Sequence, residues 1–330
     1  MPVVGPSTFR PRFPLGGPHV QTLLPAIFRK VRDVHYERER ITLPDGDFLN
    51  LDWSRAKTTS PTHRLVLISH GMEGSTDRHY VRGMARAFNR RGWDALAWNF
   101  RTCGGEMNLL PRSYHSGVSD DLGLVVARAL KEKQYKEIAL VGFSMGGNIT
   151  LKYLGEKGAR LSRRIKSAVV FSVPCDLTSS AEKLAAPSNR IYMRQFLKEL
   201  QVKMRAKHAR FPELFNLEGM EDMRSFREFD DRFTGPIHGF KGALDYWGSC
   251  ASVKFVHRIR IPTLLVNAAD DPFLTPACSP IEIARDSSYF HVELPERGGH
   301  VGFIHAQALR DVGGGPLWWT ERRALDFIGA

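Results

Sequence analysis

The stretch that decides the predicted fold is residues 138–148, IALVGFSMGGN. Four apolar residues lead into Gly142-Phe143-Ser144-Met145-Gly146, which has the pattern G-x-S-x-G, and apolar residues at helical spacing follow it. A buried strand, a sharp turn and a helix are the setting in which this pattern holds a nucleophilic serine. Small residues flank the serine because a strained turn leaves no space for side chains there. We interpret Ser144 as a candidate nucleophile; the alternative is a serine in a glycine-rich turn that has no catalytic role.

The rest of the chain continues the alternation of strand and helix. Amphipathic helices are expected at 78–91 and 119–133, and a hairpin around Asp45-Gly46 precedes them. Apolar strands are expected at 65–69, 94–100, 137–143, 168–173, 263–269 and 288–294. Strands separated by helices of this length indicate an α/β fold, in which helices cover both faces of a mostly parallel sheet.

We expect residues 1–330 to form one domain. Residues 1–33 are rich in proline and glycine and are interpreted as an irregular N-terminal arm, with a short helix near its end. Residues 175–257 contain no convincing strand, and a helix is expected at 189–207 and another at 239–250. We interpret 175–257 as a helical lid inserted between two strands of the sheet.

The composition is that of a globular protein with a sizeable core, since 42% of the 330 residues are hydrophobic and 25% are charged. The net charge is +12, but the cations are interleaved with acids and show local excess only at 10–40 and 198–210. Neither segment has the aromatic spacing of a nucleic-acid groove, so we expect a solvated surface and no nucleic-acid partner. The basic face at 198–210 is a candidate for peripheral contact with lipid surfaces.

The cysteines and the N-terminus indicate a reduced, cytoplasmic protein. Cys103, Cys175, Cys250 and Cys278 are far apart and form no C-x-x-C pair or His/Cys cluster, so we expect neither a metal nor another cofactor. The sequence shows no secretory signal and no apolar span of about 18 residues, the length that suggests a membrane helix.

A serine nucleophile needs a base and a group that orients the base. In this fold class the chain order is serine, acid, histidine. Asp270-Asp271 follows the strand at 263–269, and Gly298-Gly299-His300 follows the strand at 288–294. Both should lie at the carboxyl edge of the sheet, where ligands of open α/β sheets bind. We predict Asp271 as the acid, with Asp270 as the alternative, and His300 as the base.

Three other histidines compete with His300. His291 falls within a predicted strand and His305 within a helix predicted after the last strand, so we interpret both as structural. His70 belongs to the segment His70-Gly71-Met72-Glu73-Gly74, which follows the first central strand. An oxyanion hole takes one amide from such a loop and one from the residue after the nucleophile. We therefore predict the backbone N–H groups of Met72 and Met145 as its donors.

These motifs resemble the α/β-hydrolase superfamily, and more closely its YheT-like branch of predicted esterases, which is akin to abhydrolase-domain phospholipases and medium-chain ethyl-ester synthases. The matching segments are Gly17-Pro18-His19-Val20-Gln21-Thr22, His70-Gly71-Met72-Glu73-Gly74-Ser75, Asn99-Phe100-Arg101, Gly104-Gly105, Ser113-Tyr114-His115-Ser116-Gly117, Gly142–Asn148 around Ser144, Asn267 with Asp270-Asp271-Pro272, and Gly298-Gly299-His300-Val301-Gly302-Phe303. The resemblance implies a Ser144–Asp271–His300 triad. One departure is Thr102-Cys103, where the branch more often has Gly-Cys.

We expect a serine carboxylesterase or lipase-like hydrolase that cleaves short- to medium-chain acyl esters through an acyl-enzyme. The alternatives are an acyltransferase or thioesterase that uses the same triad, or a non-catalytic binding protein on this fold. The substrate is expected to be a small acyl ester, and the sequence defines no oligomeric state. Apolar residues of the insertion are candidates for an acyl pocket: Phe196, Leu197, Leu200, Phe211, Leu214, Phe215, Phe226, Phe229 and Phe233.

Overall fold

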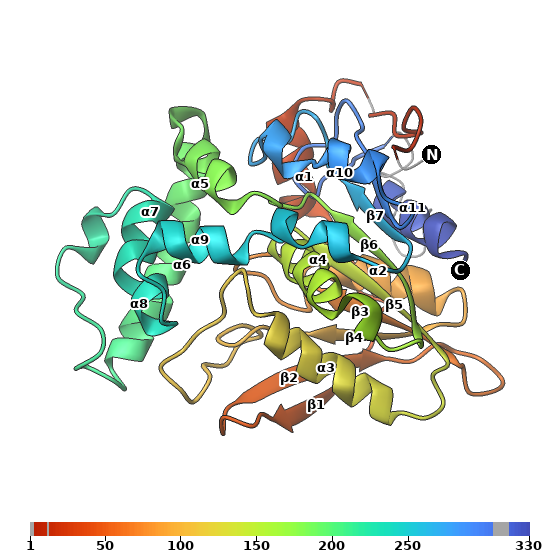
Figure 1. Cartoon of the computed structure of the whole chain (residues 1–330), viewed down its shortest axis with the longest axis horizontal. Coiled ribbons are helices and arrows are strands. Elements are labelled where there is room, and N and C mark those ends of the chain that lie inside the picture. The colour runs from red at the N-terminus through yellow and green to blue at the C-terminus, as the bar shows by residue number, and fades with distance from the viewer. Residues whose placement is uncertain (1–2, 12, 306–316) are drawn as a thin grey trace.

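The computed structural model describes residues 3–11, 13–305 and 317–330 and is built around an eight-stranded sheet with the order β1-β2-β4-β3-β5-β6-β7-β8 (Figure 1). The strands are β1 (Glu37–Thr42), β2 (Phe48–Ser54), β3 (Arg64–Ser69), β4 (Asp94–Trp98), β5 (Glu137–Phe143), β6 (Ile165–Phe171), β7 (Thr263–Val266) and β8 (Phe290–Glu293). Every neighbouring pair from β4 to β8 is parallel. The predicted mostly parallel sheet is therefore confirmed.

The antiparallel part of the sheet lies at its β1 edge. β1 pairs with β2 in the register Glu37↔Trp53, and β2 pairs antiparallel with β4. The turn between β1 and β2 contains Gly46 at φ 83°. A glycine adopts this left-handed backbone without the steric cost that a β-carbon adds, so the hairpin forms where the Asp45-Gly46 step predicts it.

Helices cover both faces of the sheet, because successive strand residues point to opposite sides. On one face, Leu65 and Leu67 of β3 pack in a core with residues of α3 (Ser119–Lys131), α4 (Met145–Lys157) and α10 (Ile281–Arg285). On the other, Val66 and Ile68 pack with residues of α2 (His79–Asn89) and α11 (Trp319–Ile328). α1 (Pro18–Phe28) precedes the sheet in the chain.

Between β6 and β7 the chain forms a group of helices that lies to one side of the sheet in Figure 1. These helices are α5 (Leu177–Ala185), α6 (Arg190–His208), α7 (Phe226–Phe229), α8 (Gly235–Ile237) and α9 (Ala243–Cys250), and we call them the helical insertion. Their apolar residues share a core with Phe273 and Leu274 of the β7–α10 connection. α9 begins later than expected because Gly239 and Gly242 have φ of 79° and 158°.

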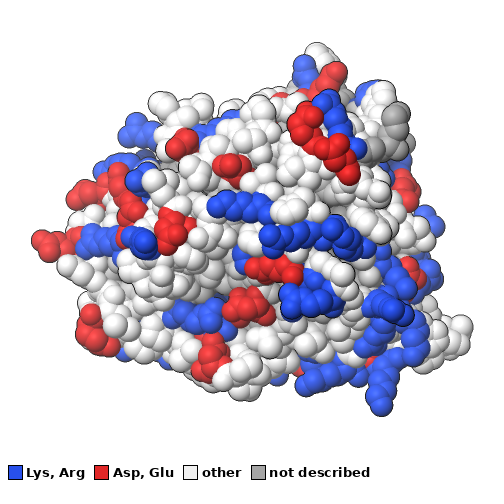
Figure 2. All heavy atoms as spheres, in the orientation of Figure 1, with Lys and Arg blue, Asp and Glu red and all other residues white. Residues whose placement is uncertain are grey.

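Charged side chains of both signs are spread over the face of the molecule shown in Figure 2. The basic surface expected at 198–210 is smaller than the sequence suggests, because Lys203 contacts the buried Glu73 and Lys207 is fully buried. Across the described part of the chain, no helix combines the length and apolar character needed to cross a bilayer.

Candidate active site

Ser144 lies in a strained turn between β5 and α4, with φ 52° and ψ −122°. A β-carbon on Gly146 would lie 2.3 Å from the carbonyl oxygen of His70, and one on Gly142 would lie 2.7 Å from the carbonyl oxygen of Gly146. These approaches explain why both flanking positions are glycine. A non-glycine residue in this backbone region costs on the order of 1–3 kcal/mol, and such strain is concentrated at functional sites.

The structure brings Ser144, Asp271 and His300 together. Nε2 of His300 lies 2.9 Å from Oγ of Ser144, and Nδ1 lies 2.9 and 3.2 Å from the two carboxylate oxygens of Asp271. The carboxylate of Asp271 accepts the Nδ1 proton, which leaves Nε2 to accept the serine hydroxyl proton. The Asp271 side chain is fully buried and that of His300 is 11% exposed.

Asp270, the alternative acid, does not contact the imidazole through a hydrogen bond. Its Oδ1 accepts the amide of Gly299 at 3.0 Å, so it braces the loop that carries His300. Burial raises the pKa of the Asp270 carboxyl above its ordinary value. The geometry therefore separates the two neighbouring acids: Asp271 orients the ring and Asp270 supports the backbone.

The other three histidines are occupied elsewhere. His70 is fully buried, with Nδ1 donating to the Gly71 carbonyl at 2.7 Å and Nε2 accepting the Phe100 amide at 3.2 Å. Burial lowers the pKa of His70 to about 3, so its ring stays neutral with both nitrogens in use. His291 lies on β8, with its ring 5.7 Å from that of Phe327.

The expectation that His305 lies in a helix is wrong. His305 forms an isolated antiparallel bridge with Pro11. The amide of the preceding residue, Ile304, donates to Oε1 of Gln21 at 2.6 Å, and its carbonyl accepts Nε2 of Gln21 at 3.2 Å. These contacts take the backbone groups that a helix would use.

The segment His70–Gly74, here called the oxyanion loop, lies beside Ser144, since a β-carbon on Gly71 would lie 3.2 Å from the Ser144 β-carbon. Met72 and Met145 both line the cavity that contains Ser144. Within the described residues, neither of their amides donates to a protein acceptor. Both N–H groups are therefore unengaged beside the serine, as donors for a developing oxyanion need to be.

A buried cluster that the sequence did not reveal holds the oxyanion loop. Oε1 of Glu73 accepts hydrogen bonds from the Tyr114 hydroxyl and, at 2.7 Å, from Nζ of Lys203 on α6. The Lys203 and Glu73 side chains are 15% and 5% exposed. Glu73 also has φ 52°, a left-handed backbone that a non-glycine residue seldom adopts. The cluster links the helical insertion directly to the residue that follows Met72.

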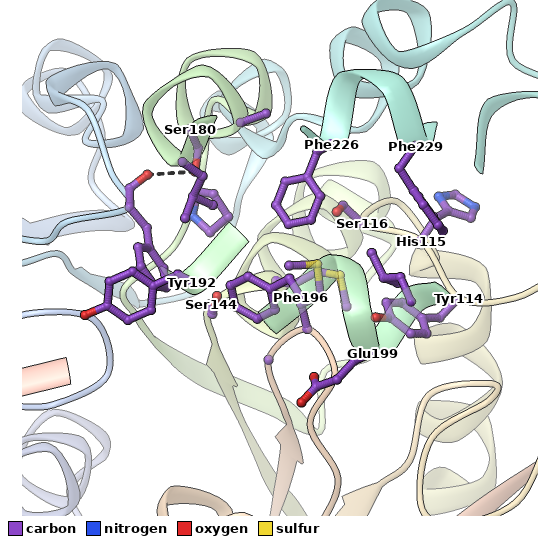
Figure 3. A pocket seen from close by; sticks show the side chains of 18 of the residues that line it. Tyr114, His115, Ser116, Ser144, Ser180, Tyr192, Phe196, Glu199, Phe226 and Phe229 are labelled. Carbon is purple, nitrogen blue, oxygen red and sulfur yellow. Dashed lines mark hydrogen bonds between the residues drawn. The ribbon is translucent and has the colours of Figure 1, made fainter. Parts of the chain in front are cut away.

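A cavity of about 540 Å³ extends from Ser144 and His300 into the helical insertion. Figure 3 shows the side chains of Phe196, Phe226 and Phe229 grouped around the same space as Ser144. Of the nine residues that the sequence suggests for an acyl pocket, six line this cavity: Phe196, Leu200, Phe215, Phe226, Phe229 and Phe233. Leu197 belongs to the core of the insertion, and Leu214 is 51% exposed, so neither contributes; Phe211 packs at the edge of that core.

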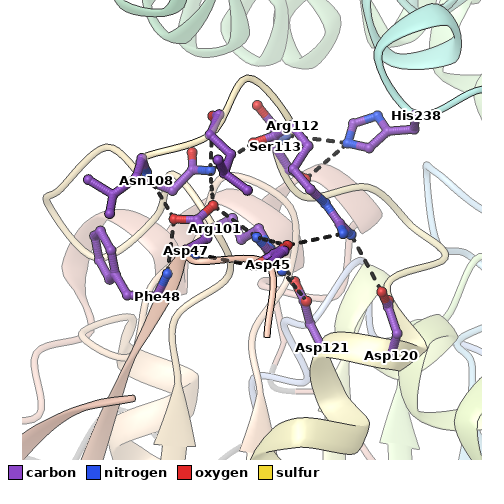
Figure 4. Close-up of polar contacts among 12 residues, drawn as sticks. Asp45, Asp47, Phe48, Arg101, Asn108, Arg112, Ser113, Asp120, Asp121 and His238 are labelled. Carbon is purple, nitrogen blue, oxygen red and sulfur yellow. Dashed lines mark hydrogen bonds and ion pairs between the residues drawn. The ribbon is translucent and has the colours of Figure 1, made fainter. Parts of the chain in front are cut away.

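The loop after β4 forms another wall of the cavity and is fixed by a buried ion-pair network (Figure 4). Arg101 donates to Asp47 at 2.8 Å and to both carboxylate oxygens of Asp121 at 2.8 and 2.9 Å. Asp47 also accepts the side-chain amide of Asn108 at 2.5 Å. All of these side chains are nearly inaccessible to solvent. Asn108 also donates to the carbonyls of Leu110 and Arg112, so the network holds the loop that leads to Tyr114 and His115 in the cavity wall.

The described residues contain no group of three or more His, Cys, Asp or Glu side chains arranged to hold a metal ion. Instead, Nε2 of His300 lies 2.9 Å from the Ser144 hydroxyl, and the amides of Met72 and Met145 belong to residues that line the same cavity as Ser144. This donor set is suited to nucleophilic acyl transfer, which needs a base, an orienting acid and fixed N–H donors.

Comparison with known proteins identifies the family of the fold. The family model for the alpha/beta hydrolase fold matches residues 64–306. The chain is 34% identical over 312 residues to YheT of Escherichia coli (strain K12), a candidate esterase, with 94% of this chain and 89% of that protein covered. It is 29% identical over 290 residues to phospholipase ABHD3 of Mus musculus, with 86% and 70% covered.

A solved structure gives the same answer for the fold. The esterase Pf2001 of Pyrococcus furiosus superimposes with a TM-score of 0.56 at 17% identity, over 99% of this chain and 98% of that one. The chain therefore belongs to the α/β-hydrolase fold family. Within that family it is of the esterase and lipase type that its two sequence relatives represent.

Proposed function

We propose that this hydrolase cleaves carboxylic esters of short- to medium-chain acyl groups through an acyl-enzyme on Ser144. The observation that carries the proposal is the continuous hydrogen-bonded line from Ser144 Oγ through the His300 ring to Asp271. A serine hydroxyl reacts only when a positioned base removes its proton, and this line supplies that base in the required tautomer.

The reaction proceeds in two steps. His300 Nε2 accepts the hydroxyl proton while Ser144 Oγ attacks the ester carbonyl carbon. The amides of Met72 and Met145 stabilise the resulting oxyanion, a contribution of about 3 kcal/mol for each donor. The imidazolium, stabilised by Asp271, then protonates the departing alcohol. A water molecule repeats the sequence on the acyl-enzyme, releases the carboxylic acid and regenerates Ser144.

The lining of the cavity supports the proposal that the enzyme recognises the apolar acyl group of its substrate. Its volume of about 540 Å³ suits a small molecule. Phenylalanine rings from α6 and α7 form much of its wall, and these helices belong to the insertion at 175–257. We propose that the insertion acts as a lid that covers the acyl chain. The esterase and phospholipase relatives support an ester substrate.

A panel of p-nitrophenyl esters from acetate to laurate tests the proposal. The wild-type protein should hydrolyse the short and medium esters, and both Ser144→Ala and His300→Ala should lower kcat by a factor of about 10⁴ or more. Wild-type and Ser144→Ala proteins that are equally active, or equally inert across all chain lengths, would contradict it. Parallel assays with thioesters of the same acyl groups, and with an added alcohol acceptor, identify a thioesterase or an acyltransferase instead.

A further inference from the structure

We infer that Thr22 and Gln21 of α1 are positioning residues that hold His300 over Ser144, an inference that rests on the proposed function of His300. α1 precedes the whole sheet, whereas the loop that carries His300, residues 298–304, follows the last strand. The two segments in contact are therefore almost the full chain apart in sequence. The resemblance to known esterases includes this segment but gives it no role.

Direct contacts connect α1 to the loop. Oγ1 of Thr22 accepts the amide of His300 at 2.9 Å and donates to the carbonyl of Pro18 at 2.7 Å. The hydroxyl therefore acts at once as an acceptor for the His300 amide and as a donor to its own helix. Gln21 is completely buried, and its side-chain amide bonds both the amide and the carbonyl of Ile304. Together the two side chains hold the loop at its histidine and at its end.

The loop needs this support because its backbone is unusual. Gly299, Val301 and Phe303 have φ of 58°, 57° and 52°. Valine and phenylalanine seldom adopt a left-handed backbone, so they remain there only where the surroundings over-determine the conformation. A loop with this backbone that lost its acceptors would relax toward commoner angles and take the His300 ring with it.

The acceptors for the loop amides come from several distant segments. The Gly299 amide donates to Asp270 at 3.0 Å, that of His300 to Thr22, and that of Val301 to Oγ of Ser172 at 2.9 Å. Among these acceptors, Thr22 is the one that binds the backbone amide of His300 itself. Its loss removes the acceptor at the catalytic position and leaves the neighbouring acceptors in place.

Close packing reinforces the hydrogen bonds. A β-carbon on Gly299 would lie 2.5 Å from the Pro18 carbonyl oxygen, and one on Gly302 would lie 2.0 Å from that of Gln21. The loop glycines therefore allow α1 to approach backbone to backbone. This approach brings Thr22 within hydrogen-bond distance of the His300 amide.

A set of threonine variants tests the inference. Thr22→Val keeps the shape of the side chain and removes its hydroxyl, while Thr22→Ser restores the hydroxyl. Thr263→Val is the matched control. The hydroxyl of Thr263 also donates to a carbonyl, that of Ile261 at 3.0 Å, but this buried threonine lies at the start of β7, away from the site. The readouts are kcat and KM for a p-nitrophenyl ester, the rate at which a fluorophosphonate labels Ser144, and the unfolding midpoint in urea.

Thr22→Val should lower kcat and the labelling rate about 10- to 100-fold with KM unchanged, since a misplacement of about 1 Å has effects of this size. Thr22→Ser should recover most of both rates, and Thr263→Val should keep both. If Thr22→Val kept wild-type rates while His300→Ala was inactive, the inference would be overturned. The proposed function would still stand, because it depends on His300 and not on Thr22. A loss that Thr22→Ser does not recover, or that Thr263→Val shares, would also overturn it. Full activity in His300→Ala would instead overturn the proposed function.

Discussion

The carbonyl oxygen of His70 lies 2.3 Å from the point that a β-carbon on Gly146 would occupy. The end of β3 and the start of α4 therefore meet backbone to backbone. This contact places the oxyanion loop beside Ser144 and forces the serine into its left-handed conformation. The same close approach that builds the site also stores strain in it.

Relief of that strain should be measurable in the free energy of unfolding. We expect Ser144→Gly to be more stable than Ser144→Ala by about 1 kcal/mol, because glycine adopts a φ of 52° without the steric penalty of a β-carbon. Urea denaturation of the two variants measures the difference. Ser249 in α9 is the control, since an exposed helical position should favour alanine over glycine by about 1 kcal/mol. Equal stability of the two Ser144 variants would argue against a strained serine.

The buried Arg101 network should contribute strongly to the free energy of unfolding. Arg101→Met leaves the buried carboxylates of Asp47 and Asp121 without their cation, so we expect a loss of about 3–5 kcal/mol in the free energy of unfolding. The matched control is Arg227→Met, which breaks an exposed pair with Asp231 and should cost less than about 1 kcal/mol. Similar losses in the two variants would contradict the role given to the buried network.

Most of the fold could be predicted from the sequence, because the signals that define its strands and helices act between residues that are close in the chain. The strands and the helices around the sheet follow from apolar periodicity and turn residues, both of which act between near neighbours. The G-x-S-x-G pattern predicted its own turn, because the packing that demands glycine involves the adjoining strand and helix. The order of the acid and the histidine could be predicted for the same reason, since each follows a recognisable strand.

The remainder depended on contacts between distant segments. The sequence favours Asp271 over Asp270 without separating them well, because only the folded loop shows which carboxylate contacts the imidazole. The support from Thr22, the Lys203–Glu73 pair and the Arg101 network join residues that lie far apart in the chain. The acyl-pocket list was too long because apolar side chains of the insertion divide between its own core and the cavity, and Leu214 faces neither.

Stability should also depend on the ionisation of Asp230, which burial shifts to a pKa of about 6 from an ordinary 3.8. Above pH 3.8 the unfolded chain ionises this group while the folded protein keeps it protonated, so the folded state loses stability as pH rises toward 6. The loss is complete above pH 6, at about 3 kcal/mol.

The Asp230→Asn variant lacks this loss and keeps an acceptor for Nε1 of Trp247, which donates to Asp230 at 2.8 Å. Its stability relative to the wild-type protein should therefore increase between pH 4 and 7, as followed by urea denaturation at a series of pH values. A difference that stays constant over this range would rule out the buried acid as its source.

The cavity predicts which substitutions change the preference for acyl length. Leu200→Trp fills part of the cavity, so kcat/KM for the longer p-nitrophenyl esters should fall by about tenfold or more, with the acetate ester less affected. Leu214→Trp is the control, because Leu214 lies outside the cavity and is exposed. A uniform change across all chain lengths would show that the acyl group binds elsewhere.

The central claim is that Ser144 becomes acylated with His300 as its base and Asp271 as the orienting acid. Mass spectrometry of the protein quenched during turnover of a p-nitrophenyl ester tests it most directly. We expect the acyl group on the peptide that contains Ser144, with the rate of its formation about 10⁴-fold lower in Asp271→Asn and much less affected in Asp270→Asn. Acylation of another residue, or p-nitrophenol release at the wild-type rate from Ser144→Ala, would contradict the account.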